Sequence, residues 1–186
     1  MVMFMIKVIA FDLVGVLVKE IDFPLGETEA KIERLFGPNK SDDEFICEVK
    51  ENILDISSNE IIQITKHIIN SIYTNKFTSK DLIELKNKYK NIKLVVATNH
   101  VSFIQEYISD HFSNILDNIY ISANIHEIKP KAEFYNKILE DLNIAPNEML
   151  FLDDSTKNVE GAKACGIHTI HVTKDMDILK EIEKFI

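Results

Sequence analysis

The chain has 186 residues, a net charge of −9, 46% hydrophobic residues and 27% charged residues. This length fits one sizeable domain, or a core domain with a modest insertion. The acidic balance argues against a nucleic-acid partner, which needs clustered lysine and arginine, and no apolar run approaches the roughly 18 residues of a membrane span. The first predicted element is a strand over residues 6–11, which ends at Asp12. The apolar residues before it lack the basic segment and cleavage site of a signal peptide.

A block without predicted strands follows between residues 20 and 90. Helices are predicted at 27–36, 42–54, 57–73 and 79–89. The third has the clearest start, because Ser57 and Glu60 have the spacing of a capping box. We interpret residues 20–77 as a small helical cap, and assign the helix at 79–89 to the sheet domain as the crossover into the next strand. The predicted core domain is therefore 1–19 and 78–186.

From residue 92 onward, predicted strands alternate with predicted helices. The strands are short, rich in Val, Ile and Leu, and mostly without polar alternation, as expected of parallel strands buried on both faces. They lie at 92–97, 118–121, 148–152 and 167–172. Apolar positions at helical spacing mark helices within 101–112, 134–142, 159–164 and 178–185. This alternation predicts an α/β fold, a Rossmann-like three-layer parallel sheet with helices on both sides.

Polar residues stand at or near the carboxyl ends of these strands, where sites form in open α/β sheets. Asp12 follows the first strand, Thr98 and Asn99 follow the second, and Asp153 and Asp154 follow the fourth. Another polar residue, a lysine in the loop before a helix, is followed by proline. Each of these features alone is ordinary in a turn or helix cap. Together they predict a nucleophile beside a site for a hard metal ion, because buried carboxylates are costly without a cation between them.

At these residues the chain resembles the haloacid dehalogenase superfamily, whose members are mostly phosphatases. The resemblance covers nearly the whole chain and rests on four segments, of which the last is the most specific: FDLVGVL at 11–17, ATN at 97–99, IKPKAEF at 128–134 and LDDSTKNVEGA at 152–162. The helical insertion resembles the family's C1-type cap. The chain looks most similar to the branch that contains glucose-1-phosphatases and the N-terminal domains of epoxide hydrolases.

The resemblance implies a role for each matching residue. Asp12 would be the nucleophile that forms an aspartyl-phosphate, and Lys129 would neutralise charge between Asp12 and the phosphate. Thr98 and Asn99 would contact the phosphoryl group. The implied cofactor is Mg²⁺, bound by Asp12, Asp154 and the Val14 backbone carbonyl. Asp153 would lie in its outer shell, together with Asn158.

The chain departs from the family pattern at Val14. Most phosphatases of the family carry there an Asp that protonates the leaving group and later deprotonates water. General acid–base catalysis contributes about 10²–10⁴ in rate, so hydrolysis of esters with poor leaving groups is expected to be slow. His126 stands where a glycine is usual. His100 is the histidine closest in sequence to the predicted site, and we interpret it as structural, with a direct role as the alternative.

The sequence therefore predicts a phosphatase of small phosphorylated metabolites. Two alternatives stay open: a dehalogenase-type hydrolase in which Asp12 attacks carbon, and a catalytically lapsed fold that binds a phosphorylated ligand or a protein partner. Cys47 and Cys165 lie in predicted helices and form no CxxC pair. They predict a reduced, cytoplasmic protein with buried thiols. The oligomeric state is open.

Overall fold

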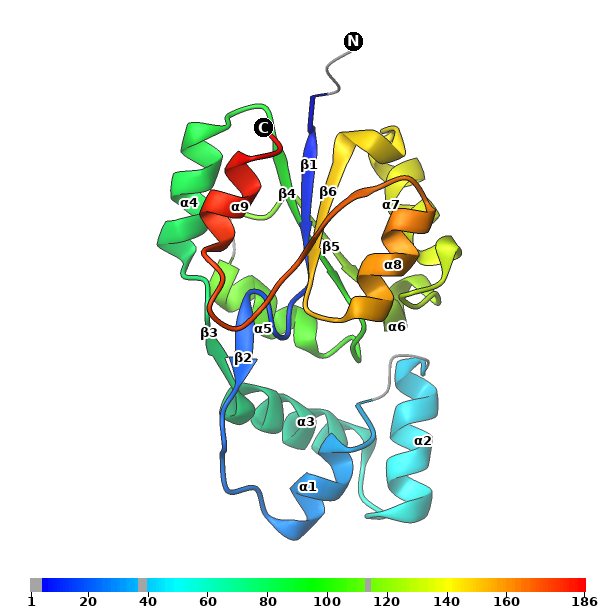
Figure 1. Cartoon of the computed structure of the whole chain (residues 1–186). Helices are drawn as coiled ribbons and strands as arrows, with labels where there is room; N and C mark the ends of the chain where they lie inside the picture. Colours follow the sequence, from blue (N-terminus) through cyan, green and yellow to red (C-terminus); the bar gives the residue numbers. More distant parts are fainter. Residues whose placement is uncertain (1–4, 37–39, 113–114) are drawn as a thin grey trace.

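The computed structural model describes residues 5–36, 40–112 and 115–186, and its central feature is a five-stranded parallel sheet (Figure 1). The strand order is β5-β4-β1-β6-β7. All five predicted strands are confirmed, with ends that differ by at most two residues: β1 Val8–Phe11, β4 Lys93–Thr98, β5 Asn118–Ile121, β6 Met149–Asp153 and β7 His168–His171. The first four residues of the apolar N-terminal segment lie outside the described residues.

Helices cover both faces of this sheet. On β1, the side chains of Ile9 and Phe11 join one buried cluster, whereas Val8 and Ala10 join another. This alternation follows from the pleat of a strand. The first cluster contains residues of α4 Ser79–Lys88, α5 Ile104–Phe112 and α9 Ile178–Glu183. The second contains residues of α7 Ala132–Leu142 and α8 Thr156–Ala164. The predicted three-layer α/β fold is confirmed.

Three further helices lie below the carboxyl edge of the sheet in Figure 1. They are α1 Glu27–Glu33, α2 Asp42–Asn52 and α3 Ser58–Ile72. The predicted start of α3 is confirmed, because the Ser57 hydroxyl accepts a hydrogen bond from the Glu60 amide and Glu60 reaches back to the Ser57 amide. Ile61 and Ile68 of α3 are fully buried. The helices thus pack through an apolar stripe.

The expectation that residues 20–90 contain no strand is wrong. The helix predicted at 57–73 ends at Ile72, and Tyr73–Asn75 forms strand β3. It pairs antiparallel with β2, Val18–Glu20, so that Glu20 lies opposite Tyr73. Three-residue strands are too short to show a period of two in the sequence. The same limit applies to the short helices α6 Ser122–Ile125 and η1 Pro146–Glu148.

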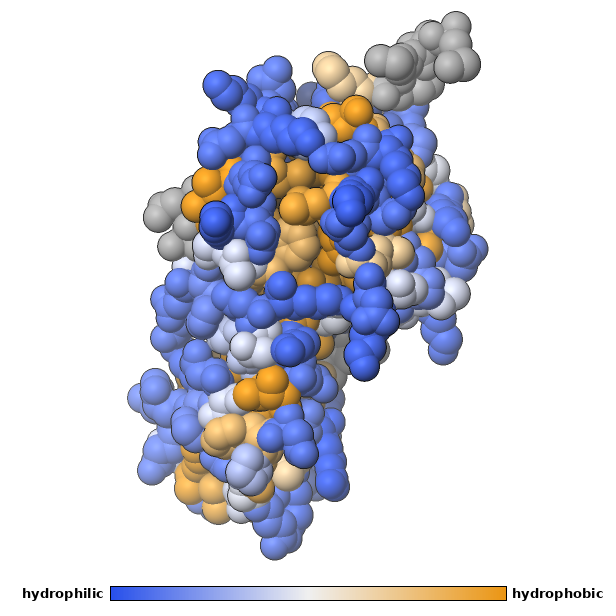
Figure 2. Space-filling view, turned by 60° about the vertical axis from the view of Figure 1, so that its left-hand side comes forward, coloured by the Kyte–Doolittle hydropathy of each residue, from blue (hydrophilic) through white to orange (hydrophobic). Residues whose placement is uncertain are grey.

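The surface is mostly hydrophilic on the face shown in Figure 2, with smaller apolar areas over both the sheet region and the lower helices. The expectation of buried thiols is wrong: Cys47 is exposed, Cys165 is only half-buried, and both are free. Cys47 lies on the outer side of its amphipathic helix, where it contacts Glu51. Among the described residues, every helix is too short or too polar to cross a lipid bilayer.

Candidate active site

The strand register brings the predicted site residues to one edge of the sheet. Phe11 of β1 pairs with Val96 of β4 on one side and with Leu152 of β6 on the other. Asp12, which follows β1, therefore lies beside Thr98 and Asp153, the last residues of the two adjacent strands β4 and β6. The chain continues from β1 to β4 and β5 on one side and returns to β6 and β7 on the other. This is the topological switch point at which open α/β sheets bind ligands.

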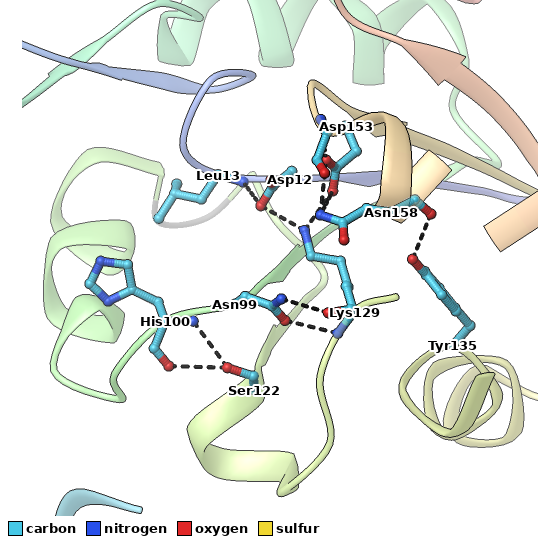
Figure 3. A network of polar contacts seen from close by, with 10 residues as sticks. Asp12, Leu13, Asn99, His100, Ser122, Lys129, Tyr135, Asp153 and Asn158 are labelled. Atoms are coloured by element: carbon cyan, nitrogen blue, oxygen red, sulfur yellow. Dashed lines mark hydrogen bonds and ion pairs between the residues drawn. The ribbon is translucent and has the colours of Figure 1, made fainter. Parts of the chain in front are cut away.

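Lys129 lies at the centre of this group, between two carboxylates (Figure 3). Its Nζ is 2.9 Å from Asp12 Oδ1 and 2.7 Å from Asp153 Oδ2. The lysine side chain is 1% exposed, and its ammonium also lies 5.3 Å from the centre of the Phe151 ring. A buried ammonium needs such partners, because an unpaired buried charge is strongly destabilising. The predicted proximity of Lys129 and Asp12 is present.

Asp12 is itself buried, with 8% of the residue exposed. Its Oδ1 accepts a hydrogen bond of 2.7 Å from the Leu13 amide. Burial raises the pKa of Asp12 to about 7, and the negative charge of Asp153 adds to this rise while Lys129 opposes it. Three carboxyl groups, those of Asp12, Asp153 and Asp154, share one lysine here, which is the electrostatic condition for binding a cation.

Asp153 is the most thoroughly hydrogen-bonded carboxylate of the site. It is fully buried, and Asn158 Nδ2 lies 3.1 Å from each of its oxygens. The Ser155 amide donates to Oδ1 at 2.8 Å. With Lys129 on Oδ2, these donors occupy both oxygens of Asp153. The outer-shell role of Asp153 and Asn158 stays a prediction.

Asp154, by contrast, is exposed and has fewer partners. Its pKa is raised, first by partial burial and then by the charge of Asp153. Its carboxylate packs against the turn after β1, where Gly15 has a φ of +87°. A Cβ on Gly15 would lie 2.2 Å from Asp154 Oδ2. Glycine is therefore required here twice, for its backbone conformation and for the close approach of the carboxylate.

The three carboxylates fit a hard divalent cation. One oxygen from each of Asp12, Asp153 and Asp154 lies within 4.8 Å of the others. Mg²⁺ prefers oxygen ligands and is commonly held by one or two carboxylates plus water. Asp12 and Asp154 offer the free carboxylate oxygens for that purpose, and the Val14 carbonyl on the adjoining turn is the further predicted ligand.

Gly15→Ala is expected to weaken Mg²⁺ binding at least tenfold, because the new methyl group displaces the Asp154 carboxylate. It should also destabilise the fold by about 1–3 kcal/mol, since alanine is strained at positive φ. Isothermal calorimetry and urea denaturation measure the two effects. Gly166→Ala is the matched control: its φ is +83°, but its Cβ would meet only Pro146, at 3.5 Å. Equal Mg²⁺ affinity in the two variants would contradict the assignment of Asp154.

The loop that carries Lys129 is held by Asn99. Its side-chain Nδ2 donates to the Lys129 carbonyl and its Oδ1 accepts from the Lys129 amide, both at 3.0 Å. The Asn99 side chain is thus engaged with the loop, which leaves the Asn99 backbone for the predicted phosphate contact. His126, at the start of this loop, has a φ of +56°. This left-handed conformation explains why glycine is usual there, and the loop still delivers Lys129 to Asp12.

Thr98 and Val14 line the remaining parts of the site. Thr98, the last residue of β4, is 1% exposed. Val14 borders a cavity of about 360 Å³ together with Asn99, His100 and residues of β2, β3 and the segment from Glu33 to Phe36. This cavity lies between the sheet edge and the inserted helices.

Several residues near the site lie outside the four motif segments, and the sequence analysis did not identify them. Lys76 Nζ donates to the Gly15 carbonyl at 3.0 Å. The Tyr135 hydroxyl donates to the Asn158 carbonyl at 2.7 Å. The Tyr73 hydroxyl lies 3.0 Å from His100 Nε2. Each of these contacts joins segments far apart in the chain, so local spacing holds no signal for them.

A family model described as "Haloacid dehalogenase-like hydrolase" matches residues 9–172. Over 77 residues, 41% of this chain, the sequence is 36% identical to "Bifunctional epoxide hydrolase 2" of Mus musculus. Over 86 residues, 45% of this chain, it is 30% identical to "Phosphorylated carbohydrates phosphatase" of Thermotoga maritima. The matches span 13% and 40% of those two proteins, so this chain covers less than half of either.

The fold is also similar to solved structures. A HAD family enzyme from Bacteroides thetaiotaomicron, in complex with magnesium and inorganic phosphate, superposes with a TM-score of 0.70 at 18% identity. The superposition covers 94% of this chain and 98% of that one. A predicted HAD-like family hydrolase from Porphyromonas gingivalis gives a TM-score of 0.72 at 19% identity, with 97% of each chain covered. At these identities the likeness concerns the fold.

Proposed function

Because the chain belongs to the haloacid dehalogenase-like hydrolase family, we propose that it is a Mg²⁺-dependent phosphatase of small phosphorylated metabolites that works through an aspartyl-phosphate. The observation that carries this proposal is the position of Lys129 between Asp12 and Asp153, with Asp154 beside them. Phosphoryl transfer needs mainly positioning and charge stabilisation, and this group supplies both. The phosphorylated-carbohydrate activity named for the Thermotoga maritima relative favours sugar phosphates as a substrate class.

The residues of the site have distinct roles in this reaction. An Asp12 oxygen attacks phosphorus, and the bond from phosphorus to the leaving-group oxygen breaks as that oxygen takes up a proton. Lys129 stabilises the negative charge of the phosphoryl oxygens during the transfer. The Thr98 hydroxyl and the Asn99 backbone orient the same oxygens. Water then attacks the aspartyl-phosphate, which releases inorganic phosphate and restores the Asp12 carboxylate.

Asp12, Asp154 and the Val14 carbonyl would hold Mg²⁺, which would supply positive charge that stabilises the phosphoryl oxygens. The three clustered carboxylates would favour binding of such a cation. Asp153 is engaged by Lys129 and Asn158, so its contribution is to hold the lysine and to set the potential of the site. The inserted helices at 20–77 form the proposed cap, which would cover the leaving group and restrict the size of the substrate.

We expect hydrolysis of 4-nitrophenyl phosphate to require Mg²⁺ and to stop when the cation is chelated. Without Mg²⁺, the negative charge of Asp153 disfavours the ionised form of Asp12, which is the form that acts as nucleophile. Protons compete for Asp12, whose pKa is raised to about 7. Mg²⁺ affinity measured by calorimetry should therefore fall as the pH is lowered through 7. Asp154→Asn should weaken binding, whereas Asp110→Asn, on the outer side of α5, should not.

A dehalogenase-type reaction at carbon is the second candidate, because the residue at position 14 is Val. Such a reaction has little use for a metal, and the three clustered carboxylates favour the phosphatase. Turnover that persists unchanged after chelation would reverse this preference. The absence of turnover with any phosphoester, together with phosphate binding, would favour a binding protein of the same fold.

The partner that we propose is a small phosphoester, and the compartment is the cytoplasm. The two free cysteines suit a reducing environment. The net charge of −9 disfavours a nucleic-acid substrate.

A further inference from the structure

The proposed phosphatase lacks a proton-transfer group at position 14. An alkoxide leaving group needs a proton, and the water that attacks the aspartyl-phosphate must lose one. Val14 has no group for either step. A replacement would have to lie beside the same cavity and carry an exchangeable proton. Several lining side chains meet this condition, and two of them, Glu20 and Tyr73, lie directly opposite one another on the β2–β3 pair.

Tyr73 lies at the edge of this cavity and is held there by several contacts. It is the first residue of β3 and is 7% exposed. Its ring packs edge-on against Tyr107, with centroids 6.1 Å apart. Its hydroxyl lies 3.0 Å from His100 Nε2. His100 in turn packs against the Phe36 ring at 5.4 Å. Tyr73 thus belongs to the cavity wall that also contains Val14 and Asn99.

The tautomer of His100 follows from its other contact. His100 Nδ1 lies 3.3 Å from the Val101 carbonyl, which can only accept a hydrogen bond. Nδ1 therefore carries the proton, and Nε2 accepts from the Tyr73 hydroxyl. Burial lowers the pKa of His100 to about 4, so the imidazole is neutral at neutral pH. His100 positions the phenol but has no acidic proton of its own to give to a leaving group.

The surroundings of Tyr73 keep its hydroxyl protonated. Burial raises the pKa of Tyr73, and the negative charges of Glu20, Glu33 and Asp12 raise it further. An alkoxide is nonetheless a stronger base than a phenolate, so transfer of the proton to a departing alkoxide is favourable. The resulting phenolate is strong enough a base to take a proton from an attacking water.

We propose that Tyr73 is the proton-transfer residue of this site. This inference rests on the proposed phosphatase function. In the first step the bond from phosphorus to the leaving oxygen breaks. That oxygen displaces His100 Nε2 as the acceptor of the Tyr73 hydrogen bond and takes the Tyr73 proton, which leaves Tyr73 as phenolate. In the second step water attacks phosphorus and gives its proton to the phenolate, which restores the Tyr73 hydroxyl, the Asp12 carboxylate and inorganic phosphate. Charges and protons balance over the cycle.

Tyr73→Phe tests this assignment through its dependence on the leaving group. We expect kcat/KM for alkyl phosphates such as glycerol phosphate to fall about 10²-fold, within the range of general acid–base catalysis. For 4-nitrophenyl phosphate, whose leaving group departs without a proton, kcat/KM should stay within about threefold while kcat falls. A burst of nitrophenolate and accumulation of the aspartyl-phosphate, seen by mass spectrometry, should accompany that fall.

Tyr107→Phe is the matched control, because it removes a hydroxyl from the neighbouring ring, which contacts Asn75 and does not border the cavity. It should leave the ratio of alkyl to aryl kcat/KM unchanged. Val14→Asp in the Tyr73→Phe background should restore alkyl turnover, since it supplies a carboxyl at the position where the family usually has one. If the role of Tyr73 were merely structural, Tyr73→Phe would lower kcat/KM for alkyl and aryl phosphates by the same factor. Val14→Asp would then not restore turnover.

The outcomes separate the inference from the function on which it rests. If Tyr73→Phe leaves the ratio of alkyl to aryl kcat/KM unchanged, the inference is overturned. If the ratio falls in Glu20→Gln and not in Tyr73→Phe, the proton-transfer residue is Glu20 instead. Wild-type turnover of aryl phosphate with no turnover of small alkyl phosphates also overturns it while the phosphatase stands. A wild type that hydrolyses neither class in the presence of Mg²⁺ overturns both.

Discussion

Asp12→Asn is expected to abolish phosphatase turnover while the protein stays folded. An amide is a poor nucleophile at phosphorus, and neither of the other carboxylates occupies the position of Asp12: Asp153 is engaged by Lys129 and Asn158, and Asp154 lies against the turn at Gly15. Loss of a covalent nucleophile costs on the order of 10⁴ or more in kcat. Steady-state hydrolysis of 4-nitrophenyl phosphate with Mg²⁺ measures the effect. Asp110→Asn, an exposed change on α5, is the control.

The same substitution should stabilise the ion-free protein, and the gain should depend on pH. The Asn oxygen still accepts from Lys129. The folded state raises the pKa of Asp12 from 3.8 to about 7, so wild-type stability falls as the pH rises between these two values. The variant lacks this titration. Its advantage in urea denaturation should therefore grow from about pH 4 to pH 7 and then level off. Substantial residual turnover, or a gain that shrinks with rising pH, would contradict the role of Asp12.

Lys129→Met is expected to impair both stability and catalysis. Methionine fills the space of the lysine stem, but Asp12 and Asp153 then face each other without a cation. Removal of one partner from a buried ion pair costs about 3–5 kcal/mol, and loss of charge stabilisation at the phosphoryl group costs about 10²–10³ in kcat. Urea denaturation without Mg²⁺ and turnover with Mg²⁺ measure the two effects. Binding of beryllium fluoride, a phosphoryl mimic, should weaken as well.

Lys131→Met provides the matched control, because Lys131 lies two residues further along the same loop and is exposed. It should leave both quantities nearly unchanged. If Lys129→Met were as stable as the wild type across neutral pH, the ammonium would not be the group that holds the two carboxylates together. If it were unstable but fully active, its role would be structural alone.

The sequence predicted the strands well because each one is a short apolar run that ends in a recognisable polar residue. Asp12 follows β1, Thr98 ends β4 and Asp153 ends β6. It also predicted the start of α3, since Ser57 and Glu60 act through local backbone contacts. It did not predict β2 and β3, whose three residues each pair with a partner more than fifty positions away. Pairing at that distance leaves no local pattern.

The candidate site divides in the same way. The sequence by itself determined which residue types stand at the strand ends, and hence Asp12, Lys129 and the Asp153–Asp154 pair, because strand direction and parallel pairing bring these ends together. Only the tertiary structure decided that Asn99 holds the Lys129 loop, that Gly15 admits the Asp154 carboxylate, and that Tyr73 reaches the cavity beside Val14. These relations depend on distances between distant segments, which are set by packing and register rather than by spacing along the chain.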